Sequence, residues 1–379
     1  MDLPDSDERY QEQILPHVSR TFALTIPQLP PGLRTAVTNA YLMCRIADTI
    51  EDEPALSAQE TYVYLKRFAA VVSGAGDAAA LARELVRRFS DRTLPAEREL
   101  VANMERVVRV TGRLGKQRAA IERCIDIMCR GMHEFQRTAS VRGLPSSSDL
   151  DSYCYYVAGV VGEMLTELFC AHSPAVDAQR EALAGLSVSF AQGLQMTNIL
   201  KDFWEDRSRG ACWLPQEVFS RYGVELERLS PERADSRFQA GLAELVGVAH
   251  AHLRNALAYT LLIPRAETGI RRFCLWAIGL AVLTLRRIAA NPAFTRGTEV
   301  KVSHRAVLLT RLCTSLVLRD DEMLRRLFEL AARGLPLGAP LAGAQAARAA
   351  AAARAAPAIE DGFGPARTAG AARGGAAPS

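Results

Sequence analysis

The stretch AYLMCRIADTIEDE, residues 40–53, changes character within one helical segment. Its first part, 40–47, is mostly apolar and is typical of a helix that enters a protein core. Asp48, Glu51 and Asp52 follow at positions i, i+3 and i+4, so their carboxylates share one helix face. Three like charges at the end of a buried helix repel one another unless cations neutralise them. The stretch therefore predicts a core helix that ends in a cation site.

The stretch KDFWEDRSRG, residues 201–210, repeats the arrangement with Asp202, Glu205 and Asp206. Facing each other across a bundle cavity, the two clusters would form an oxygen-rich site suited to Mg²⁺, which prefers oxygen ligands and shares its coordination with substrate phosphates. Either cluster alone is also compatible with a solvated helix end. Two clusters, each joined to an apolar helix, favour the metal site.

Polar and basic residues beside the clusters fit a phosphorylated ligand. Arg45 lies three residues before the first carboxylate, and Lys201 directly precedes the second cluster. Both can bind phosphate oxygens that the metal leaves uncovered. Gln195 and Asn198 lie near the same helical stripe as the second cluster. The simplest ligand is a diphosphate.

Helical periodicity runs through most of the chain from about residue 33, and few segments alternate with period two. We expect an all-α protein with helices at 33–50, 58–74, 77–90, 97–111, 115–138, 149–171, 177–206, 236–263, 266–290, 303–314 and 319–333. No break resembles an interdomain linker, so residues 1–338 are predicted to form one helical domain. Residues 339–379, almost wholly Ala, Gly, Arg and Pro, are predicted to be disordered.

The segment DSYCYYVAGVVGEMLTELF, residues 151–169, interleaves Ala158, Gly159 and Gly162 with aromatic and aliphatic residues, Tyr153 among them. Small residues permit the close approach of either an apolar ligand or another helix. From the residues alone, close helix packing is the favoured alternative.

Composition narrows the function classes. The net charge of +4 in 379 residues argues against a nucleic-acid partner. The eight cysteines form no CxxC pair, which indicates reduced, mostly buried thiols in a cytosolic protein.

The longest apolar run, 273–285, is shorter than the roughly 20 residues that cross a bilayer. No dinucleotide-binding GxGxxG motif opens a strand–helix unit, so a nicotinamide site would be of another kind.

Four segments together resemble, in order and spacing, the signature segments of the squalene and phytoene synthases: 19–30 (SRTFALTIPQLP), 41–53, 153–169 and 197–219 (TNILKDFWEDRSRGACWLPQEVF). YVAG and CWLPQEVF are closer to squalene synthases. The resemblance implies an isoprenoid-synthase bundle with a central apolar cavity. It also implies Mg²⁺-dependent head-to-head joining of two farnesyl diphosphates through presqualene diphosphate, with NADPH-dependent reduction to squalene.

By resemblance, the site residues divide into groups. The Mg²⁺–diphosphate ligands would be Asp48, Glu51, Asp52, Asp202 and Asp206, with Glu205 in support. The diphosphate region would be lined by Ser19, Arg20, Phe22, Arg45, Gln195, Asn198 and Lys201. Tyr153 would lie near the reacting carbons and handle a proton.

Two departures concern the reductive step. Ala277 and Ile278 replace the Pro-Gln of eukaryotic squalene synthases, and the segment 300–305 is less basic than theirs. Lys301, His304 and Arg305 remain as expected NADPH contacts. The alternatives are a synthase that stops at presqualene diphosphate, dehydrosqualene or hydroxysqualene, one that makes phytoene from geranylgeranyl diphosphate, and a non-catalytic helical scaffold.

The end of the sequence does not resemble the membrane anchor of eukaryotic homologues. We therefore expect a cytoplasmic protein that touches the inner face of the membrane peripherally to release its product. We expect it to be a monomer or a weak homodimer.

Overall fold

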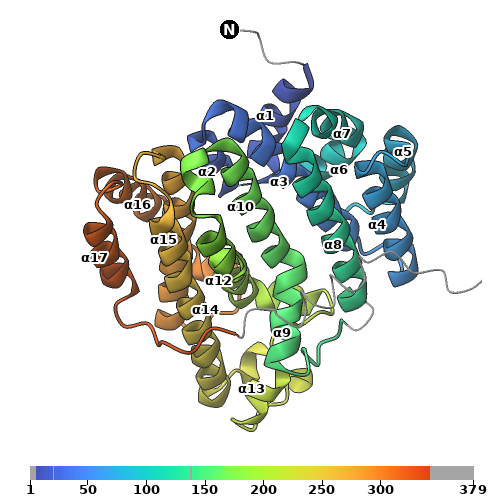
Figure 1. Ribbon diagram of the computed structural model, residues 1–379. Helices are drawn as coiled ribbons and strands as arrows, with labels where there is room; N and C mark the ends of the chain where they lie inside the picture. Colours follow the sequence, from blue (N-terminus) through green and yellow to red (C-terminus); the bar gives the residue numbers. More distant parts are fainter. Residues whose placement is uncertain (1–5, 20, 137–138, 342–379) are drawn as a thin grey trace, which may run out of the picture.

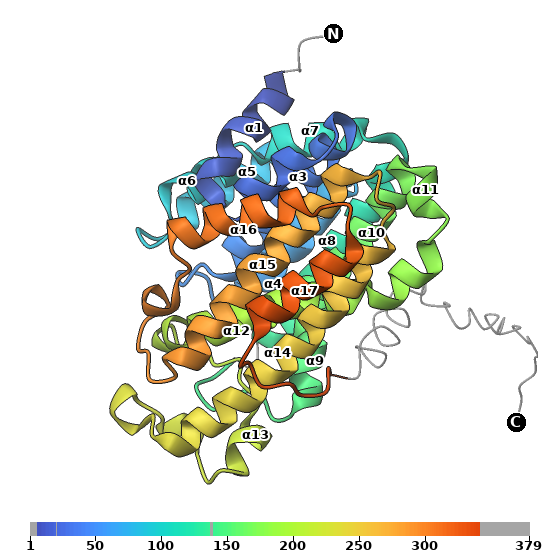
Figure 2. The same cartoon turned by 90° about the vertical axis from the view of Figure 1, so that its left-hand side faces the viewer.

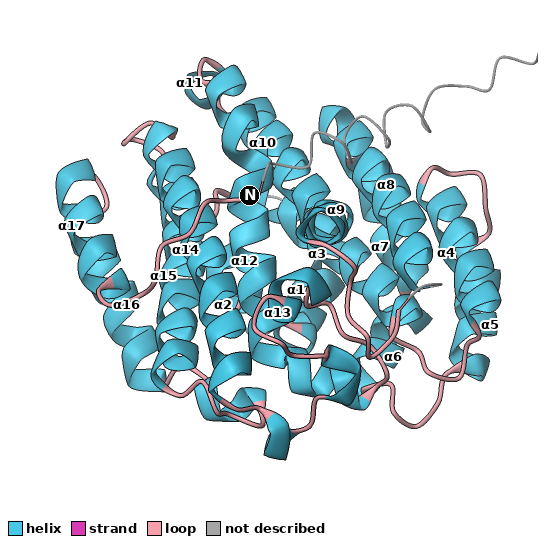
Figure 3. Cartoon of the chain, turned by 90° about the horizontal axis from the view of Figure 1, so that it is seen from below, coloured by secondary structure: helices cyan, strands magenta, loops and turns pink. Residues whose placement is uncertain are grey.

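The computed structural model describes residues 6–19, 21–136 and 139–341 (Figure 1). The α-helices are α1 (Ser6–Val18), α2 (Phe22–Thr25), α3 (Pro31–Glu51), α4 (Ala58–Val72), α5 (Ala78–Arg88), α6 (Pro95–Ala102), α7 (Met104–Arg113), α8 (Arg118–Gln136), α9 (Ser147–Cys154), α10 (Val160–His172), α11 (Pro174–Asp177), α12 (Arg180–Ser208), α13 (Gln216–Ser220), α14 (Ser236–Leu262), α15 (Thr268–Ala290), α16 (His304–Leu316) and α17 (Asp321–Ala332). The described residues form no β-strand, and Figure 3 shows helices joined by loops. The all-α prediction is confirmed.

The two helices that carry the acidic clusters are central to the bundle. α12 packs against α10, α14 and α15, and α3 packs against α1, α4, α7 and α8. In Figure 1, α16 and α17 form one edge of the molecule, and α4 and α5 form the opposite edge. Most of α3 is buried before the helix ends at Glu51, so the core holds this helix and presents its last turn to the cavity.

Local sequence explains where several helices begin. Pro31 opens α3, where its missing N–H costs nothing because the first helical N–H groups have no partner within the helix. Ser57 caps α4 by accepting a hydrogen bond from the Glu60 N–H, and the Glu60 side chain accepts one from the Ser57 N–H in return.

The small residues of 151–169 serve helix packing. A Cβ added to Gly162 would lie 2.1 Å from the Ser187 carbonyl oxygen, so α10 touches the backbone of α12 here. The predicted single helix over 149–171 is interrupted by a π-helical turn at Tyr155–Gly159, between α9 and α10. Such turns often mark functional sites because they re-aim the side chains around them.

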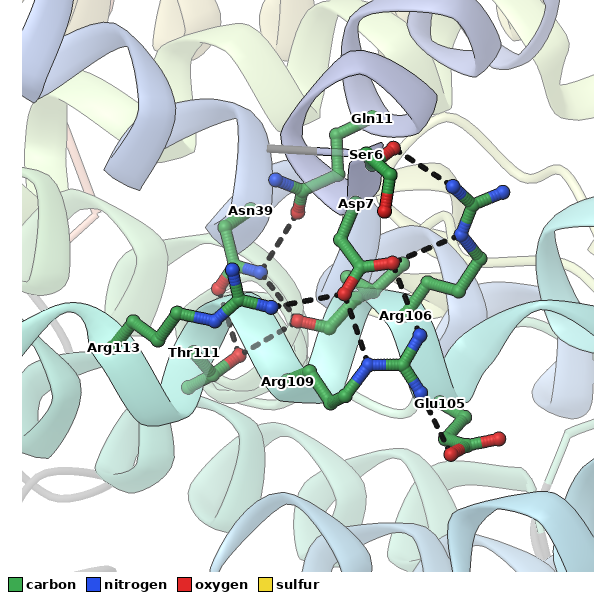
Figure 4. A network of polar contacts seen from close by, with 10 residues as sticks. Ser6, Asp7, Gln11, Asn39, Glu105, Arg106, Arg109, Thr111 and Arg113 are labelled. Carbon is green, nitrogen blue, oxygen red and sulfur yellow. Dashed lines mark hydrogen bonds and ion pairs between the residues drawn. The ribbon is translucent and has the colours of Figure 1, made fainter. Parts of the chain in front are cut away.

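The helix α1 was missed by the periodicity, which begins at about residue 33. Its sequence is mainly polar, and one of its buried residues is Asp7, which is 4% exposed. Asp7 accepts hydrogen bonds from Arg106, Arg109 and Arg113 of α7 (Figure 4). The hydrogen bond from Arg109, followed by that from Arg106, lowers the pKa of Asp7 against the opposing effect of burial. Ion pairs with α7 therefore hold α1 in place, although the apolar pattern of its own sequence does not predict a helix.

Thiol burial agrees with the sequence. All eight cysteines are free, and seven of them are buried.

Two helical segments, Ser147–His172 and Thr268–Ala290, are long and apolar enough to cross a membrane, but 67% and 61% of their most apolar windows are buried inside the fold. The apolar run at 273–285 thus lies in a buried helix, as expected.

The last described residues pack back onto α14. The Gly338 N–H donates to the Gly247 carbonyl at 3.0 Å, and the Leu341 N–H donates to Nε2 of His252 at 3.1 Å. These contacts cover the first three residues of the predicted tail; the rest of the tail, from residue 342, lies outside the described residues.

Candidate active site

The end of α3 and the end of α12 face each other across a cavity of about 480 Å³. The cavity is lined by Arg45, Asp48, Glu51, Asp52, Val157, Gln195, Asn198, Ile199, Lys201, Asp202, Glu205, Asp206, Arg209 and Trp213. Both acidic clusters are therefore brought together, as are Arg45, Gln195, Asn198 and Lys201, which the sequence placed beside them. Apart from Val157, Ile199 and Trp213, the walls are polar.

Negative charge exceeds positive charge in this cavity, where six carboxylates meet three cations. Burial raises the pKa of Asp48 to about 7, although Arg45 opposes the shift. Burial likewise raises the pKa of Asp206 to about 6 against the effect of Arg209. Glu51 is affected most, because burial and the neighbouring Asp52 raise its pKa well above the usual range. The cavity is thus electrostatically prepared for a cation.

The residues present fit Mg²⁺. Glu51 Oε1 and Glu205 Oε2 are buried and have no hydrogen-bond partner among the described residues, which leaves two oxygen atoms free to coordinate. Carboxylate oxygens are the ligands that Mg²⁺ prefers. Within the described ranges, no three His, Cys, Asp or Glu side chains already converge as a metal cage. This arrangement suits a metal that shares its coordination with a phosphate ligand rather than one enclosed by protein.

Arg209, which the sequence reasoning did not single out, connects the two clusters. Its Nη2 lies 2.8 Å from Asp206 Oδ1, and its Nη1 lies 3.8 Å from Asp52 Oδ1. Its position three residues after Asp206 was the available signal, because that spacing puts the two side chains on one helix face. Among the described cations that line the cavity, Arg209 pairs with acids of both clusters. It can therefore contact a ligand that binds between the two clusters.

The other two cations each stay with one cluster. Lys201 Nζ lies 3.0 Å from Asp202 Oδ2. Arg45 lies 3.7 Å from Asp48 Oδ2, and it also pairs at 2.8 Å with Glu97 of α6. Arg45 is therefore shared with a residue outside the cavity. Because the Arg209 contact with Asp52 is also longer than its contact with Asp206, the α3 cluster is the less neutralised of the two.

Glu205 holds a turn in place. Its Oε1 accepts a hydrogen bond from the Gly297 N–H at 2.8 Å, at the start of the 3₁₀ turn η6 (Gly297–Val300). A Cβ at position 297 would lie 2.9 Å from Asp202 Oδ1, so glycine lets this turn approach the cluster closely. One Glu205 oxygen thus supports the site, while the other faces it without a partner.

Tyr153 lies directly behind the cavity wall. Its ring stacks on Trp213, which lines the cavity, with 4.1 Å between ring centroids and 9° between planes. Burial raises the pKa of the Tyr153 phenol well above its usual range, and the carboxylate of Glu51 adds to the effect. The phenol stays protonated, so it is available as a hydrogen-bond donor.

Several predicted residues lie outside the cavity. Ser19 Oγ accepts a hydrogen bond from the Phe22 N–H at 3.0 Å, and the Phe22 ring packs on Tyr41 at 5.1 Å. Arg20 lies outside the described residues. The three predicted NADPH contacts, Lys301, His304 and Arg305, are exposed beside or within the first turn of α16, and none of them lines the cavity.

Comparisons with known proteins agree with one another. The sequence model of the squalene/phytoene synthase family matches residues 15–306. Squalene synthase ERG9 of Candida albicans is 29% identical over 294 residues, which are 75% of this chain and 62% of the relative. Squalene synthase of Solanum lycopersicum is 31% identical over 289 residues, which are 75% of this chain and 65% of the relative. The match thus spans less than two thirds of each relative.

Solved structures show the same fold. A ligand complex of TcSQS superposes with a TM-score of 0.69 at 24% identity, covering 87% of this chain and 99% of the other. A dehydrosqualene synthase bound to a ligand superposes with a TM-score of 0.57 at 21% identity, covering 85% and 96%.

Proposed function

The chain belongs to the squalene/phytoene synthase family, and we propose that it is a Mg²⁺-dependent prenyltransferase that joins two farnesyl diphosphates head to head. In this proposal presqualene diphosphate forms first and NADPH-dependent reduction gives squalene. The observation that carries it is the convergence of two acidic clusters, separated by more than 150 residues of sequence, on one cavity of about 480 Å³.

The chain's own residues have distinct roles in this reaction. Asp48, Glu51, Asp52, Asp202 and Asp206 would hold Mg²⁺, which when bound neutralises the diphosphate and assists its departure. Lys201 and Arg209 donate hydrogen bonds to phosphate oxygens and hold the bound diphosphate in place. Gln195 and Asn198 offer amide groups on the same wall of the cavity.

The apolar part of the cavity wall protects the reacting carbons. Val157, Ile199 and Trp213 are apolar and exclude water, which would otherwise capture a carbocation. Behind Trp213, the protonated Tyr153 phenol is the proton-handling group of the proposal. It is a catalytic residue if the Trp213 ring moves aside when the hydrocarbon chains bind.

A second candidate function follows from the position of the predicted NADPH contacts. Because Lys301, His304 and Arg305 do not line the cavity, these residues do not fit a nicotinamide bound beside the acidic clusters. A head-to-head synthase that needs no reductant accommodates this. Its product would be presqualene diphosphate, dehydrosqualene, hydroxysqualene or, from geranylgeranyl diphosphate, phytoene.

One product assay separates these functions. The purified full chain is incubated with farnesyl diphosphate and Mg²⁺, with and without NADPH, and the products are identified by mass spectrometry. Squalene formed only with NADPH supports the first function, and a product profile indifferent to NADPH supports the second. Turnover of geranylgeranyl but not farnesyl diphosphate would assign phytoene synthesis, and turnover of neither would leave the scaffold alternative standing.

The proposed setting is the cytoplasm, with peripheral contact at the inner face of the membrane and a monomer or weak homodimer as the assembly. An apolar C30 product is poorly soluble in water, so contact with a bilayer would give it a path out of the protein.

A further inference from the structure

The helix α16 carries its apolar residues on the outside. Four leucines are exposed by more than half: Leu308 (64%), Leu309 (60%), Leu312 (56%) and Leu316 (76%). Thr314 is the one residue of this helix that is fully buried. An ordinary surface helix places its leucines toward the core and its threonines toward water, so α16 has the reverse arrangement.

Contacts with α15 fix this orientation. A Cβ added to Gly279 of α15 would lie 2.5 Å from a methyl carbon of Thr310, and the Arg311 guanidinium lies 4.5 Å from the centre of the Trp276 ring. The inner face of α16 is therefore occupied, and its leucine face points away from the molecule. Figure 2 shows α16 on an outer surface, beside α15 and α17.

Positive charge surrounds the leucines. The segment 300–319 contains Lys301, Arg305, Arg311 and Arg319 and no Asp or Glu. Arg305 lies three and four residues before the first two leucines, so it shares their face. Arg305 and Arg319 are exposed and form no ion pair within the described part of the chain. A stripe of leucines about 12 Å long is thus bounded by arginines at both ends.

We propose that the outer face of α16 docks on a bilayer containing anionic lipid, with the helix lying in the plane of the membrane surface. Exposed apolar stripes bounded by cations are suited to this interface, where leucines enter the acyl boundary and arginines meet lipid phosphates. A helix of 13 residues is too short to cross the bilayer.

Charge disfavours the competing occupants. A second copy of the chain would bring its own arginines against this leucine face, and the nearest acids lie outside the segment, at Glu299 and at 320–322. The segment 342–379 carries four arginines against Glu360 and Asp361, so it too is positive. Anionic lipid is the occupant whose charge complements the rim.

A hydrogen-bonded turn connects the docking face to the site. The turn η6, whose Gly297 N–H donates to Glu205 of the second cluster, is followed within four residues by α16. The use of a membrane contact at α16 for delivering an apolar product rests on the proposed function.

Vesicle flotation tests the proposal. The full chain is mixed with phosphatidylcholine vesicles that contain or lack phosphatidylglycerol, at low and high salt. We expect binding to the anionic vesicles at low salt and at least tenfold weaker binding of the double variant Leu309→Asp/Leu312→Asp, because each leucine contributes buried apolar area. Both leucines are exposed, so the variant should keep the wild-type circular dichroism spectrum and melting temperature.

Leu94→Asp is the matched control. Leu94 is 59% exposed, and it directly precedes α6, which packs against α5; Figure 1 shows α5 at the edge of the molecule opposite α16. It should bind vesicles as the wild type does. Neutralising the tail arginines 348, 354, 367 and 373 in the full chain should also leave most of the binding intact.

Four results would overturn the proposal. They are the absence of wild-type binding, equal binding to vesicles without anionic lipid, equal loss in the Leu94 control, and loss through the tail variant alone. A wild-type dimer that the α16 variant dissociates would assign the face to a second copy. Turnover measured in detergent should be unchanged in the α16 variant, so failure of the docking face and failure of the proposed enzyme activity are distinguishable.

Discussion

The two acidic clusters have the same spacing in the sequence but different surroundings in the structure. The α3 cluster has Arg45, which it shares with Glu97, and the longer of the two Arg209 contacts, at 3.8 Å from Asp52. The α12 cluster has Lys201 and Arg209, and Glu205 binds the turn η6 beside it. Burial is the main cause of the raised pKa in both clusters, and the pKa reaches about 7 for Asp48 and about 6 for Asp206. The same motif is thus less neutralised on α3, which should gain more from a bound cation.

The largest effect should come from removing one carboxylate of either cluster. Asp48→Asn and Asp202→Asn should each lower kcat by about 10²–10³-fold, since both halves hold the charge of the leaving diphosphate. Asp126→Asn, which removes an aspartate paired with Arg130 outside the cavity, is the control and should be near wild type. Unchanged turnover in both cavity variants would contradict a catalytic role for the two clusters and favour the scaffold alternative.

Tyr153→Phe should have the next largest effect, about 10²-fold on kcat, which is the lower range for losing a proton-handling group. The stacked ring is retained, so binding of farnesyl diphosphate should change little. Tyr155→Phe is the matched control, because the Tyr155 hydroxyl is bonded to Glu163 instead. Equal losses in both variants would point to disturbance of the π-helical turn rather than to chemistry.

Arg209→Gln should act on binding more than on the chemical step. It removes a cation that pairs with both clusters, and we expect KM for farnesyl diphosphate to rise about tenfold, as for the loss of one charged hydrogen bond. Steady-state kinetics measures the split between KM and kcat. Arg142→Gln, an exposed arginine paired with Glu227 outside the cavity, should leave both constants unchanged.

The smallest expected effect is on the pH dependence of the stability of the metal-free protein. The pKa of Asp48 is about 7 in the folded state against 3.8 for an ordinary aspartate, so the folded protein holds this proton more tightly. The stabilisation is fully present below the unfolded pKa and is lost as the pH rises through about 7. Buried His252, whose pKa burial lowers to about 4, has the opposite dependence, because it loses stability as the pH falls below its usual 6.5.

Comparison with Asp48→Asn cancels the contribution of His252. Between about pH 5 and about pH 8, metal-free wild type should lose roughly 2–4 °C more in Tm than the variant, the shift that about 1 kcal/mol causes in a domain of this kind. Added Mg²⁺ should raise the Tm of the wild type more at the higher pH. It should raise the Tm of Asp48→Asn less than that of Asp202→Asn. If the Tm of the wild type and that of Asp48→Asn change with pH in parallel, the α3 cluster is not the less neutralised of the two.

Local patterns predicted the helices that bury an apolar face. α3, α12, α14 and α15 begin and end within about three residues of the predicted limits, because helix periodicity and turn-forming residues act over a few positions. α1 was missed because its position depends on Asp7 and on three arginines about 100 residues away. The split between α6 and α7 at Asn103 was missed as well.

For the candidate site, the sequence alone determined which carboxylates share a helix face. The spacings of Asp48, Glu51 and Asp52, and of Asp202 and Asp206, put each set on one face of its helix whatever the rest of the chain does. Only the tertiary structure decided that the two faces meet and that Arg209 links them. It also decided that Tyr153 lies behind Trp213 and that 301–305 stays outside the cavity. The physical reason is range: helical phase follows from neighbours three and four residues apart, whereas burial, pKa and contact between clusters depend on how distant helices pack.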